Sequence, residues 1–408
     1  MSNVPELRFS GFSENYINHL FENIFLFSTG KNIKQNEASP EYKTPCVRYG
    51  ELYHLYDEVI TQVVNKTNLN ESELTFSEGN EILLPSAGED PLDIGSASAL
   101  TLRNIAIGRT INILRPKEEN AYSQIYVSYY INQKLRKKIS TLARGVSISN
   151  VYNSDLKTLM INLPLLPEQQ KIATFLSAVD KKLRYLRHKQ ALLETYKRGA
   201  MQKIFLQEFR FKQDNGTDFP DWEERLLGDV SERQIQKNAN SLIKRVLTNS
   251  ATKGILDQQD YFDKDIANLN NLMGYYIVSK GDYVYNPRIS VHAPVGPINK
   301  NKVGDGVMSP LYSVFRFNNA NDLFYEQYFK TTAWHKYMKS IANYGARHDR
   351  MNITTVDFMA IPLPCPCEEE QQKITEFLST LDKKLEAVQS QISQTEKFKK
   401  GLLQKMFV

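Results

Sequence analysis

Two nearly identical stretches of sixteen residues occur far apart in this chain. Residues 168–183 read EQQKIATFLSAVDKKL, and residues 370–385 read EQQKITEFLSTLDKKL. A duplicated catalytic site would require reactive side chains in the repeated stretch, and this one contains mostly Leu, Ile, Phe, Lys, Gln and Glu. The repeat therefore indicates a duplicated architecture, with which any fold of this chain must be consistent.

The duplication extends over both halves of the chain. At an offset of 202 positions, residues 76–88 (FSEGNEILLPSAG) overlie residues 278–290 (VSKGDYVYNPRIS). Near the end of each half the match shifts to an offset of 200, so that MINLP at 160–164 overlies AIPLP at 360–364. Each half is thus predicted to be a mixed globular part followed by a helix, and 408 residues suffice for two such domains.

A mostly apolar stripe with an average spacing of 3.5 residues runs through each repeated stretch and beyond it. Such a stripe, kept over about five heptads, is typical of a coiled coil. Because a narrow seam suits one partner helix better than a broad core, we expect the two helices to pair. The alternative is that each helix packs separately on its own domain. The stripes comprise Ile172, Leu176, Val179, Leu183, Leu186, Gln190, Leu193, Lys197, Ala200 and Ile204, and Ile374, Leu378, Leu381, Leu385, Val388, Ile392, Thr395, Lys399, Leu402 and Met406.

The globular parts are predicted to be of the mixed α/β (α+β) class. Residues 101–116 and 309–317 alternate as strands do, and Gly-rich and Pro-rich turns occur in both halves. Aromatic-rich stretches with helical spacing follow at 122–139 and 323–341. We expect their Tyr and Phe side chains to lie in the core rather than to stack on bases.

Composition leaves several classes of protein open and excludes others. Lys and Arg number 51 against 46 Asp and Glu, and this mild excess of +5 is compatible with nucleic-acid binding. The sequence begins MSNVPELRFS and contains no long apolar run, so we expect a cytoplasmic protein. Three cysteines, Cys46, Cys365 and Cys367, are too few for a disulfide framework and lack the spacing of a zinc site.

Catalytic motifs are absent from the sequence. There is no P-loop, no G-x-S-x-G and no His-x₃-His spacing, and YNPR at 285–288 has Arg where an amino-methyltransferase motif has its second Pro. We therefore predict no catalytic residues and no metal site. Two related but divergent units on a shared helical frame suit a ligand with two different halves, such as double-stranded DNA with a split recognition sequence.

The chain resembles the specificity subunits of type I restriction-modification systems. The resemblance is carried by PELRFSGFSENY near the N-terminus, its echo at 209–230, the two LP…EQQKI..FLS..DKKL junctions, and GDYVYNPRIS and SPLYSVF in the second half. Together these stretches cover nearly the whole chain. In this order they are highly specific.

The resemblance implies an architecture and a set of partners. Target recognition domains at 1–165 and 208–367 would each read one half of a bipartite DNA site, and helices at 166–207 and 368–408 would pair as an antiparallel coiled coil with pseudo-two-fold symmetry. Two modification (methyltransferase) subunits would dock on the helices, and two restriction subunits would complete the complex. S-adenosylmethionine, ATP and magnesium are expected on those partners, and no cofactor on this chain.

Two loops in each half are predicted to contact DNA, because they diverge within the aligned frame. They follow the strand-like run (86–88 and 288–292) and the aligned glycine (145–150 and 345–350). Arg, Ser, Asn and His side chains can reach base edges or phosphates, although each could also be an ordinary solvated turn residue. The candidates are Ser86, Gly88, Arg144, Ser147, Ser149 and Asn150 in the first half, and Arg288, Ser290, His292, Arg347, His348 and Arg350 in the second. Weaker candidates for phosphate contact are Lys31, Lys34, Arg109, Lys244, Lys300 and Lys302.

Two other hypotheses remain open on the sequence alone. A coiled-coil scaffold with two protein-binding heads would share the heptads and the repeat, but it gives no reason for Arg-rich divergence at matched loops. A stand-alone nuclease could be sought in PEYK at 40–43, although such short strings arise by chance.

Overall fold

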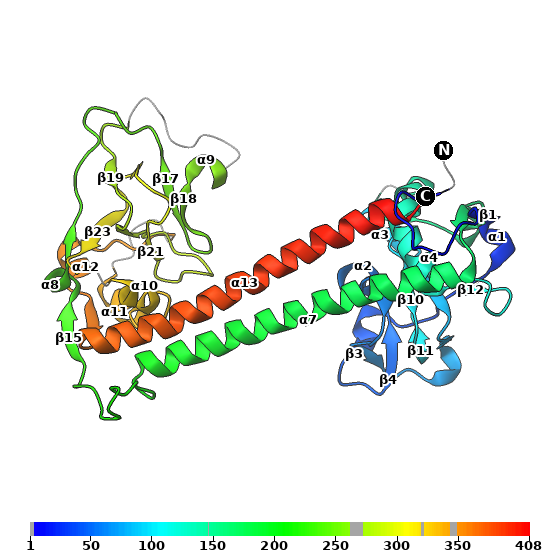
Figure 1. Cartoon of the computed structure of the whole chain (residues 1–408), viewed down its shortest axis with the longest axis horizontal. Coiled ribbons are helices and arrows are strands. Elements are labelled where there is room, and N and C mark those ends of the chain that lie inside the picture. Colours follow the sequence, from blue (N-terminus) through cyan, green and yellow to red (C-terminus); the bar gives the residue numbers. More distant parts are fainter. Residues whose placement is uncertain (1–3, 146, 262–271, 320–321, 343–348) are drawn as a thin grey trace. The chain divides into compact units, whose positions relative to one another are not determined.

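The computed structural model describes residues 4–145, 147–261, 272–319, 322–342 and 349–408, and these form two compact units. Unit 1 comprises Met1–His188 together with Gln389–Val408, and unit 2 comprises Lys189–Val388. Two long helices, α7 (Leu166–Phe205) and α13 (Glu368–Met406), each contribute one part to each unit. Figure 1 shows both helices with the strands and short helices of the units.

Unit 1 contains two five-stranded sheets. The first has the order β2-β12-β8-β10-β5, in which β12 is antiparallel to both of its neighbours. The second has the order β3-β6-β4-β11-β7. Strand pairs β1-β14 and β9-β13 complete the unit. The strands are β1 (Ile17–Leu20), β2 (Phe25–Thr29), β3 (Ala38–Ser39), β4 (Thr44–Val47), β5 (Val59–Ile60), β6 (Lys66–Thr67), β7 (Phe76–Glu78), β8 (Glu81–Pro85), β9 (Ala87–Gly88), β10 (Ser98–Leu100), β11 (Arg103–Ile107), β12 (Ile111–Pro116), β13 (Ser149–Asn150) and β14 (Met160–Leu163).

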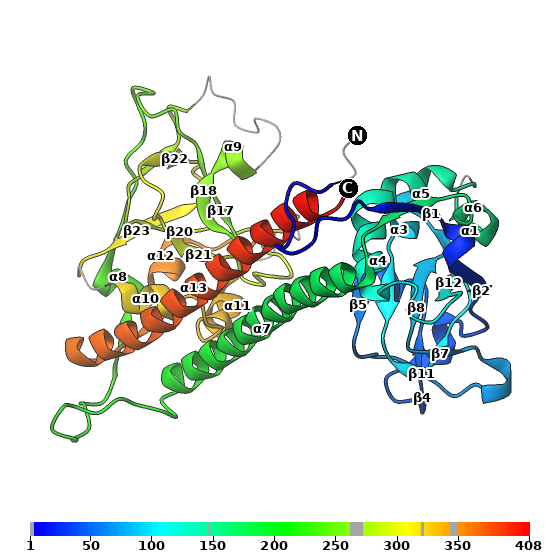
Figure 2. The same ribbon diagram turned by 45° about the vertical axis from the view of Figure 1, so that its right-hand side comes forward.

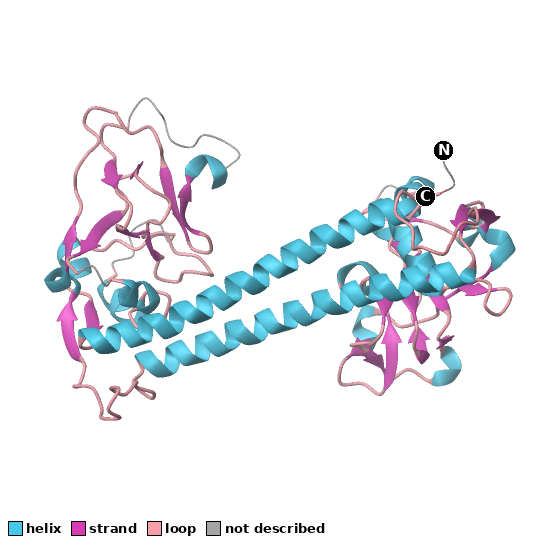
Figure 3. Ribbon diagram, in the orientation of Figure 1, coloured by secondary structure: helices cyan, strands magenta, loops and turns pink. Residues whose placement is uncertain are grey.

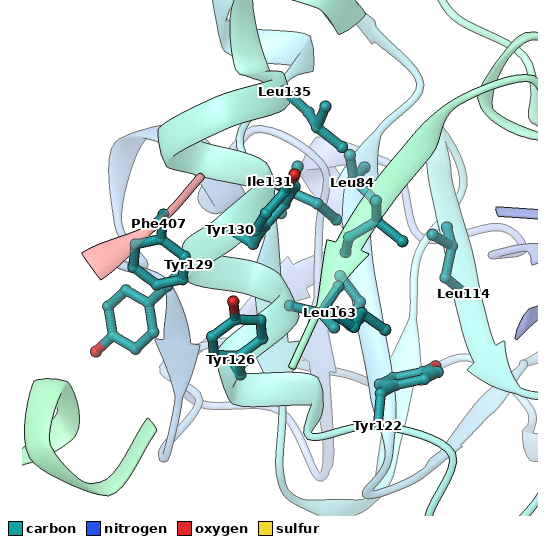
Figure 4. Close-up of a cluster of buried hydrophobic side chains, with 14 of the residues drawn as sticks. Leu84, Leu114, Tyr122, Tyr126, Tyr129, Tyr130, Ile131, Leu135, Leu163 and Phe407 are labelled. Carbon is teal, nitrogen blue, oxygen red and sulfur yellow. The ribbon is translucent and has the colours of Figure 1, made fainter. Parts of the chain in front are cut away.

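The helices of unit 1 enclose an aromatic core. α4 begins after Ser123, whose side chain accepts a hydrogen bond from Tyr126 N, and it continues through a π-helical turn into α5. Tyr126 and Tyr129 are fully buried, which confirms the expectation that these rings belong to the core (Figure 4). Phe407, just after α13, packs against the same cluster. The short helices are α1 (Phe21–Ile24), α2 (Glu51–His54), α3 (Pro91–Ile94), α4 (Gln124–Tyr130), the π-helix (Ile131–Leu135), α5 (Arg136–Leu142) and α6 (Asn153–Leu156), with 3₁₀ turns at Gln35–Glu37 and Glu71–Glu73.

Unit 2 is built around a four-stranded sheet of order β16-β23-β20-β21. Figure 3 shows the strands in magenta and the helices in cyan. Three strand pairs, β15-β24, β17-β18 and β19-β22, accompany it. The strands are β15 (Glu223–Leu226), β16 (Ser231–Arg233), β17 (Leu247–Ser250), β18 (Gly254–Asp257), β19 (Tyr276–Val278), β20 (Tyr283–Tyr285), β21 (Ile298–Lys300), β22 (Gly306–Met308), β23 (Ser313–Phe317) and β24 (Pro362–Cys365). The short helices are α8 (Leu227–Val230), α9 (Gln258–Tyr261), α10 (Leu323–Tyr328), α11 (His335–Ile341) and α12 (Thr355–Met359).

The predicted strands and helices are largely confirmed, with two corrections. Residues 101–116 form β11 and β12, but the strand expected over 309–317 begins only at Ser313, because Tyr312 N donates to Ser309 O and closes a turn. The aromatic stretch at 323–341 forms two helices rather than one. Turn hydrogen bonds such as Thr331 N to Tyr328 O interrupt it.

Both heptad stripes are buried as predicted. Every stripe residue is buried or half-buried, and none is exposed. In unit 1, Lys399 of α13 pairs with Asp180 of α7, and Glu396 pairs with Arg187. Because the residue number rises along one helix as it falls along the other, the helices pair antiparallel, and the expectation of a helical pair is confirmed. Residues of the stripe near the start of α7 also pack on the globular core, so part of the alternative holds as well.

The structure corrects the alignment of the two halves at β14 and β24. Phe21 N donates to Leu159 O, and in unit 2 Leu227 N donates to Ile361 O. Residue 159 therefore corresponds to 361, and MINLP at 160–164 matches residues 362–366 rather than 360–364. The offset is 200 at Val151 and Met351, which donate to the preceding loop in the two units, and it is 202 at α6 and α12, which begin at 153 and 355. The second half therefore has two residues without a counterpart in the first half, and they lie just before α12.

Candidate nucleic-acid interface

One edge of the first sheet in unit 1 gathers several polar loops. β12 is antiparallel to β2 and β8, so the carboxyl ends of β2 and β8 lie beside the amino end of β12 (Figure 2). Gly30 N donates to Ile111 O, and Ser86 N donates to Thr110 O, so both loops lie against the turn that precedes β12. We call this set of loops, residues 30–34, 86–88, 108–110 and 147–150, the unit 1 edge.

The two loops that the sequence nominated in the first half come together at this edge. β9 and β13 pair so that Gly88 lies opposite Ser149, and Val151 N donates to Ser86 O. Gly88 and Ser149 are buried, so they form the backbone junction of the two loops and offer no free side chain. Ser147 and Arg144 are exposed, although the Arg144 guanidinium donates to Asp155 at 2.6 Å.

The corresponding loops of unit 2 also meet. Arg288 and Arg350 form an antiparallel bridge, and Ile289 N donates to Asp349 O at 3.0 Å. The Arg288 guanidinium lies 3.4 Å from the Asp349 carboxylate, and both side chains are about half exposed. Ser290 and His292 are exposed, whereas Arg347 and His348 lie outside the described residues. We call residues 286–292, 309–312 and 349–350 the unit 2 edge.

A hollow of about 400 Å³ opens at the unit 2 edge. Its lining combines two guanidinium groups with hydroxyl and amide groups and the large exposed side chain of Leu311. Guanidinium groups suit acceptor atoms of bases or phosphates, and the apolar side chain suits a methyl group. The lining residues include Asn286, Arg288, Ser290, Leu311, Tyr312 and Arg350.

The weaker candidates separate into two kinds. Lys300 pairs with Asp322 and Lys302 with Glu326, each at 2.6 Å, so their charges are neutralised within unit 2. Lys31, Lys34, Arg109 and Lys244 are exposed and form no ion pair among the residues that the structure covers. Sequence reasoning missed Leu311. The repeat could have drawn attention to it, since Leu311 lies on the turn before β23 that corresponds to the turn of Arg109 before β12.

The starts of the two long helices are held by repeated contacts. In unit 1, Arg8 forms a bidentate ion pair with Glu168 at 2.7 and 2.8 Å, and in unit 2 Arg210 forms one with Glu370 at 2.7 and 3.2 Å. The hydrogen bond with the glutamate raises the pKa of each arginine. Each glutamate accepts one more hydrogen bond, from Tyr16 OH or from Trp222 Nε1. All of the charged partners obey the offset of 202.

A second repeated ion pair joins α7 to α13 inside each unit. Lys399 lies 2.8 Å from Asp180 in unit 1, and Lys197 pairs with Asp382 at 2.5 Å in unit 2. Both lysines occupy stripe positions, so an amino group replaces an apolar contact at the same place in each unit. Lys399 also contacts Glu58 of the globular part at 3.0 Å.

The two clusters differ in their electrostatics. Burial lowers the pKa of Lys197. Burial acts in the same direction on Lys399, but the charges of Glu58 and Asp180 and their hydrogen bonds outweigh it and raise its pKa. Burial alone would raise the pKa of Asp382, yet the hydrogen bond from Lys197 and the charge of Lys330 together lower it. The helical frame is thus repeated in its contacts and different in its charge balance.

Comparison with known proteins matches this arrangement to a family. The family model described as type I restriction modification DNA specificity domain matches residues 20–195 and again residues 220–396. The chain is 27% identical over 311 residues to the putative type I restriction enzyme MjaX specificity subunit of Methanocaldococcus jannaschii, which covers 72% of this chain and 70% of that protein. It is 23% identical over 363 residues to the type I restriction enzyme MjaVIII specificity subunit of the same organism. That alignment covers 86% of this chain and 82% of that protein.

The fold has a solved relative of similar extent. A type I restriction-modification S subunit from M. genitalium superposes with a TM-score of 0.63 at 16% identity, over 99% of both chains. Among the described residues, no helix is long and apolar enough to span a bilayer. The chain belongs to the type I restriction-modification DNA specificity family, as a DNA-recognition subunit with two copies of the domain and no catalytic role of its own.

Proposed function

We propose that this chain reads a bipartite double-stranded DNA sequence, with one half-site contacted by each edge. The observation that carries the proposal is the contrast between the repeated helical frame and the divergent edges. The frame repeats its charged partners at one offset, whereas at the edges Ala87 lies opposite Asn150 in unit 1 and Arg288 lies opposite Arg350 in unit 2. A protein that holds two different readers on one frame suits a target with two different halves.

The chemistry of each candidate side chain suggests which DNA contact it would make. In unit 2, Arg288 and Arg350 suit bidentate contact with guanine or contact with phosphate, and Ser290 and His292 stand beside them. Arg347 and His348 remain candidates from the sequence. In unit 1, Ser86, Ser147, Asn150 and Arg144 are the candidates, with Gly88 and Ser149 shaping the loops. We take 1–165 and 208–367 as the target recognition domains.

The helices at 166–207 and 368–408 would set the distance between the half-sites. The 40 residues of α7 span about 60 Å at 1.5 Å per residue, against about 34–36 Å per turn of DNA. Repeated contacts on the frame offer equivalent surfaces to two modification subunits, and two restriction subunits would complete the assembly. S-adenosylmethionine, ATP and magnesium would be bound by those partners, in the cytoplasm.

Mapping of methylated bases in the genome of the source strain tests the bipartite target. We expect one motif with two specified parts and an unspecified spacer. In the complex with the modification subunit, Arg288→Ala should relax or change one part and leave the other unchanged, because Arg288 belongs to one edge only. Ser86→Ala, on the corresponding loop of unit 1, serves as the counterpart for the other part. A contiguous motif, or an Arg288→Ala effect on both parts, would contradict the proposal.

Native mass spectrometry tests the number of partners. One copy of this chain should bind two modification subunits, since the Arg8–Glu168 and Arg210–Glu370 contacts present the same frame twice. A complex that saturates at one modification subunit would argue against two equivalent docking surfaces.

A further inference from the structure

The turn between β11 and β12 is the most firmly held part of the unit 1 edge. Gly108 N donates to Val47 O and Arg109 N donates to Asn32 O, each at 2.8 Å, while Thr110 O accepts from Ser86 N. Thr110 has φ of 67°, a left-handed conformation that β-branched residues rarely adopt. Three separate segments therefore fix the backbone of this turn.

The loop after β2 supports the turn from one side. A Cβ atom on Gly30 would lie 2.0 Å from Gly108 O, so only glycine allows this close approach. Asn32 and Ile33 have φ of 50° and 53°, and the Ile33 side chain is buried, which holds the strained backbone in place. Backbone strain that the surrounding structure maintains is often found at functional sites.

The side chain presented by this turn is a free arginine. Arg109 is exposed, and its guanidinium forms no hydrogen bond or ion pair with the residues that the structure describes. Lys31, whose backbone N donates to Ile107 O, is exposed on the adjacent loop. The unit 1 edge thus carries positive charge that is not neutralised within the described part of the protein.

Unit 2 presents a different side chain on the corresponding turn. The Arg115–Glu81 ion pair of unit 1 recurs as Arg316–Asp282 in unit 2, so these strands correspond at an offset of 201. Leu311 therefore lies one residue beyond the position of Arg109, on the same turn before the strand. Leu311 is 59% exposed and lines the hollow together with Arg288. On these two turns unit 1 carries Ser86 and Arg109, and unit 2 carries Arg288 and Leu311. Before the strand, unit 1 thus presents an arginine where unit 2 presents an apolar side chain.

We propose that Arg109 in unit 1 and Leu311 in unit 2, on the turns that precede β12 and β23, are specificity-determining DNA contacts. This inference rests on the proposed function and names further residues of the same edges. Arg109 donates to the guanine O6 and N7 acceptors, which its planar guanidinium matches. Leu311 packs against the C5-methyl group of a thymine, the main apolar feature of the major groove.

Arg109 is tested in the complex with the modification subunit, by fluorescence anisotropy on a duplex that carries the mapped two-part sequence. Arg109→Leu should weaken binding by roughly tenfold or more and relax one position in the unit 1 half-site, the loss expected for one bidentate contact. Arg109→Lys should fail to restore that position. Arg103→Leu, at the other end of β11 and also exposed, is the matched control and should stay within about twofold of the parent.

The outcomes for Arg109 separate the two proposals. Parent-like affinity and motif for Arg109→Leu would overturn the guanine contact. A loss of affinity with an unchanged motif, restored by Arg109→Lys, would overturn it as well and would indicate a phosphate contact instead. In either case the two-part motif of the parent complex would still support the proposed function. Absence of a two-part motif in the parent would overturn the proposed function itself.

Leu311 is tested by removing a single methyl group from the DNA. Replacement of one thymine by deoxyuridine in the unit 2 half-site should weaken binding of the parent by about fourfold, the value of one buried methyl-sized group. Leu311→Ala should lose this discrimination, so that the two duplexes bind equally. A half-site with no methyl-sensitive position, or a Leu311→Ala variant that keeps the parent's discrimination, would overturn the assignment.

Discussion

The helical frame and the reading edges of the two units differ in how strictly they repeat. On the frame, the Arg–Glu and Lys–Asp pairs recur at one offset and with nearly equal geometry. At the edges, the corresponding turns carry different side chains, Arg109 in unit 1 and Leu311 in unit 2, while the strands that follow these turns pair in the same order. Side chains that must meet a fixed partner inside the protein are thus retained, and side chains that face outward vary.

The ion pairs that join α7 to α13 in the two units show where even the helical frame differs. One lysine in unit 1 faces two carboxylates, Asp180 and Glu58, whereas Asp382 in unit 2 is shared by Lys197 and Lys330. The repeat therefore conserves the pair and not its surroundings. The surroundings come from the globular parts, which have diverged.

The largest expected effect concerns the aromatic residue that ends each helical part. Phe407 is 2% exposed and packs on Tyr126, whereas Phe205, at the matched position, is only partly buried against Phe324. Phe407→Ala should lower the free energy of unfolding of unit 1 by about 3–5 kcal/mol, the usual cost for a buried phenylalanine, and Phe205→Ala should cost unit 2 less. Hydrogen exchange resolved by unit measures both. Equal losses would contradict the difference in burial.

The buried glutamates should give a smaller and more equal pair of effects. The Glu168 and Glu370 side chains are at most 1% exposed, and removing either leaves its arginine without a charged partner on the helix. We expect Glu168→Ala and Glu370→Ala each to cost about 3 kcal/mol, at the low end for a broken buried pair because the arginines retain some solvent contact. Urea unfolding measures this, with exposed Glu119→Ala as the control. A large difference between the two would show that the frame is not energetically repeated.

The smallest effect is a difference in pH dependence between the two lysines. The folded pKa of Lys399 is raised, so its contribution is complete below the ordinary value of 10.5 and is lost as pH rises through the folded value. Burial lowers the folded pKa of Lys197, so unit 2 should gain stability as pH rises through the folded value toward 10.5. Both tryptophans, Trp222 and Trp334, lie in unit 2 and report its unfolding by fluorescence. Lys197→Met should abolish the gain, and a gain that persists would contradict the assignment.

Local patterns in the sequence predicted the regular elements, and distant partners could not be predicted. The heptad stripes, the strands around Ile113 and the buried aromatic helix follow from periodicity alone. The contact of Lys399 with Glu58 joins residues 341 positions apart, and nothing near either residue signals it. The candidate loops were predicted from divergence within an aligned frame, but burial of Gly88 and Ser149 depends on the β9-β13 pairing, which has only two residues per strand.

The division of unit 1 between two distant segments has a consequence for the order of events during synthesis. Leu7 N donates to Lys405 O in unit 1, and in unit 2 Phe209 N donates to Lys203 O within a continuous chain. As the chain leaves the ribosome, unit 2 has all of its residues once Val388 has emerged. Unit 1 emerges earlier, but it lacks its core residues Leu402, Met406 and Phe407 until after unit 2 is complete. The apolar stripe of α7 therefore has no partner helix while about half of the protein is synthesised. At this stage exposed apolar surface is most prone to aggregate.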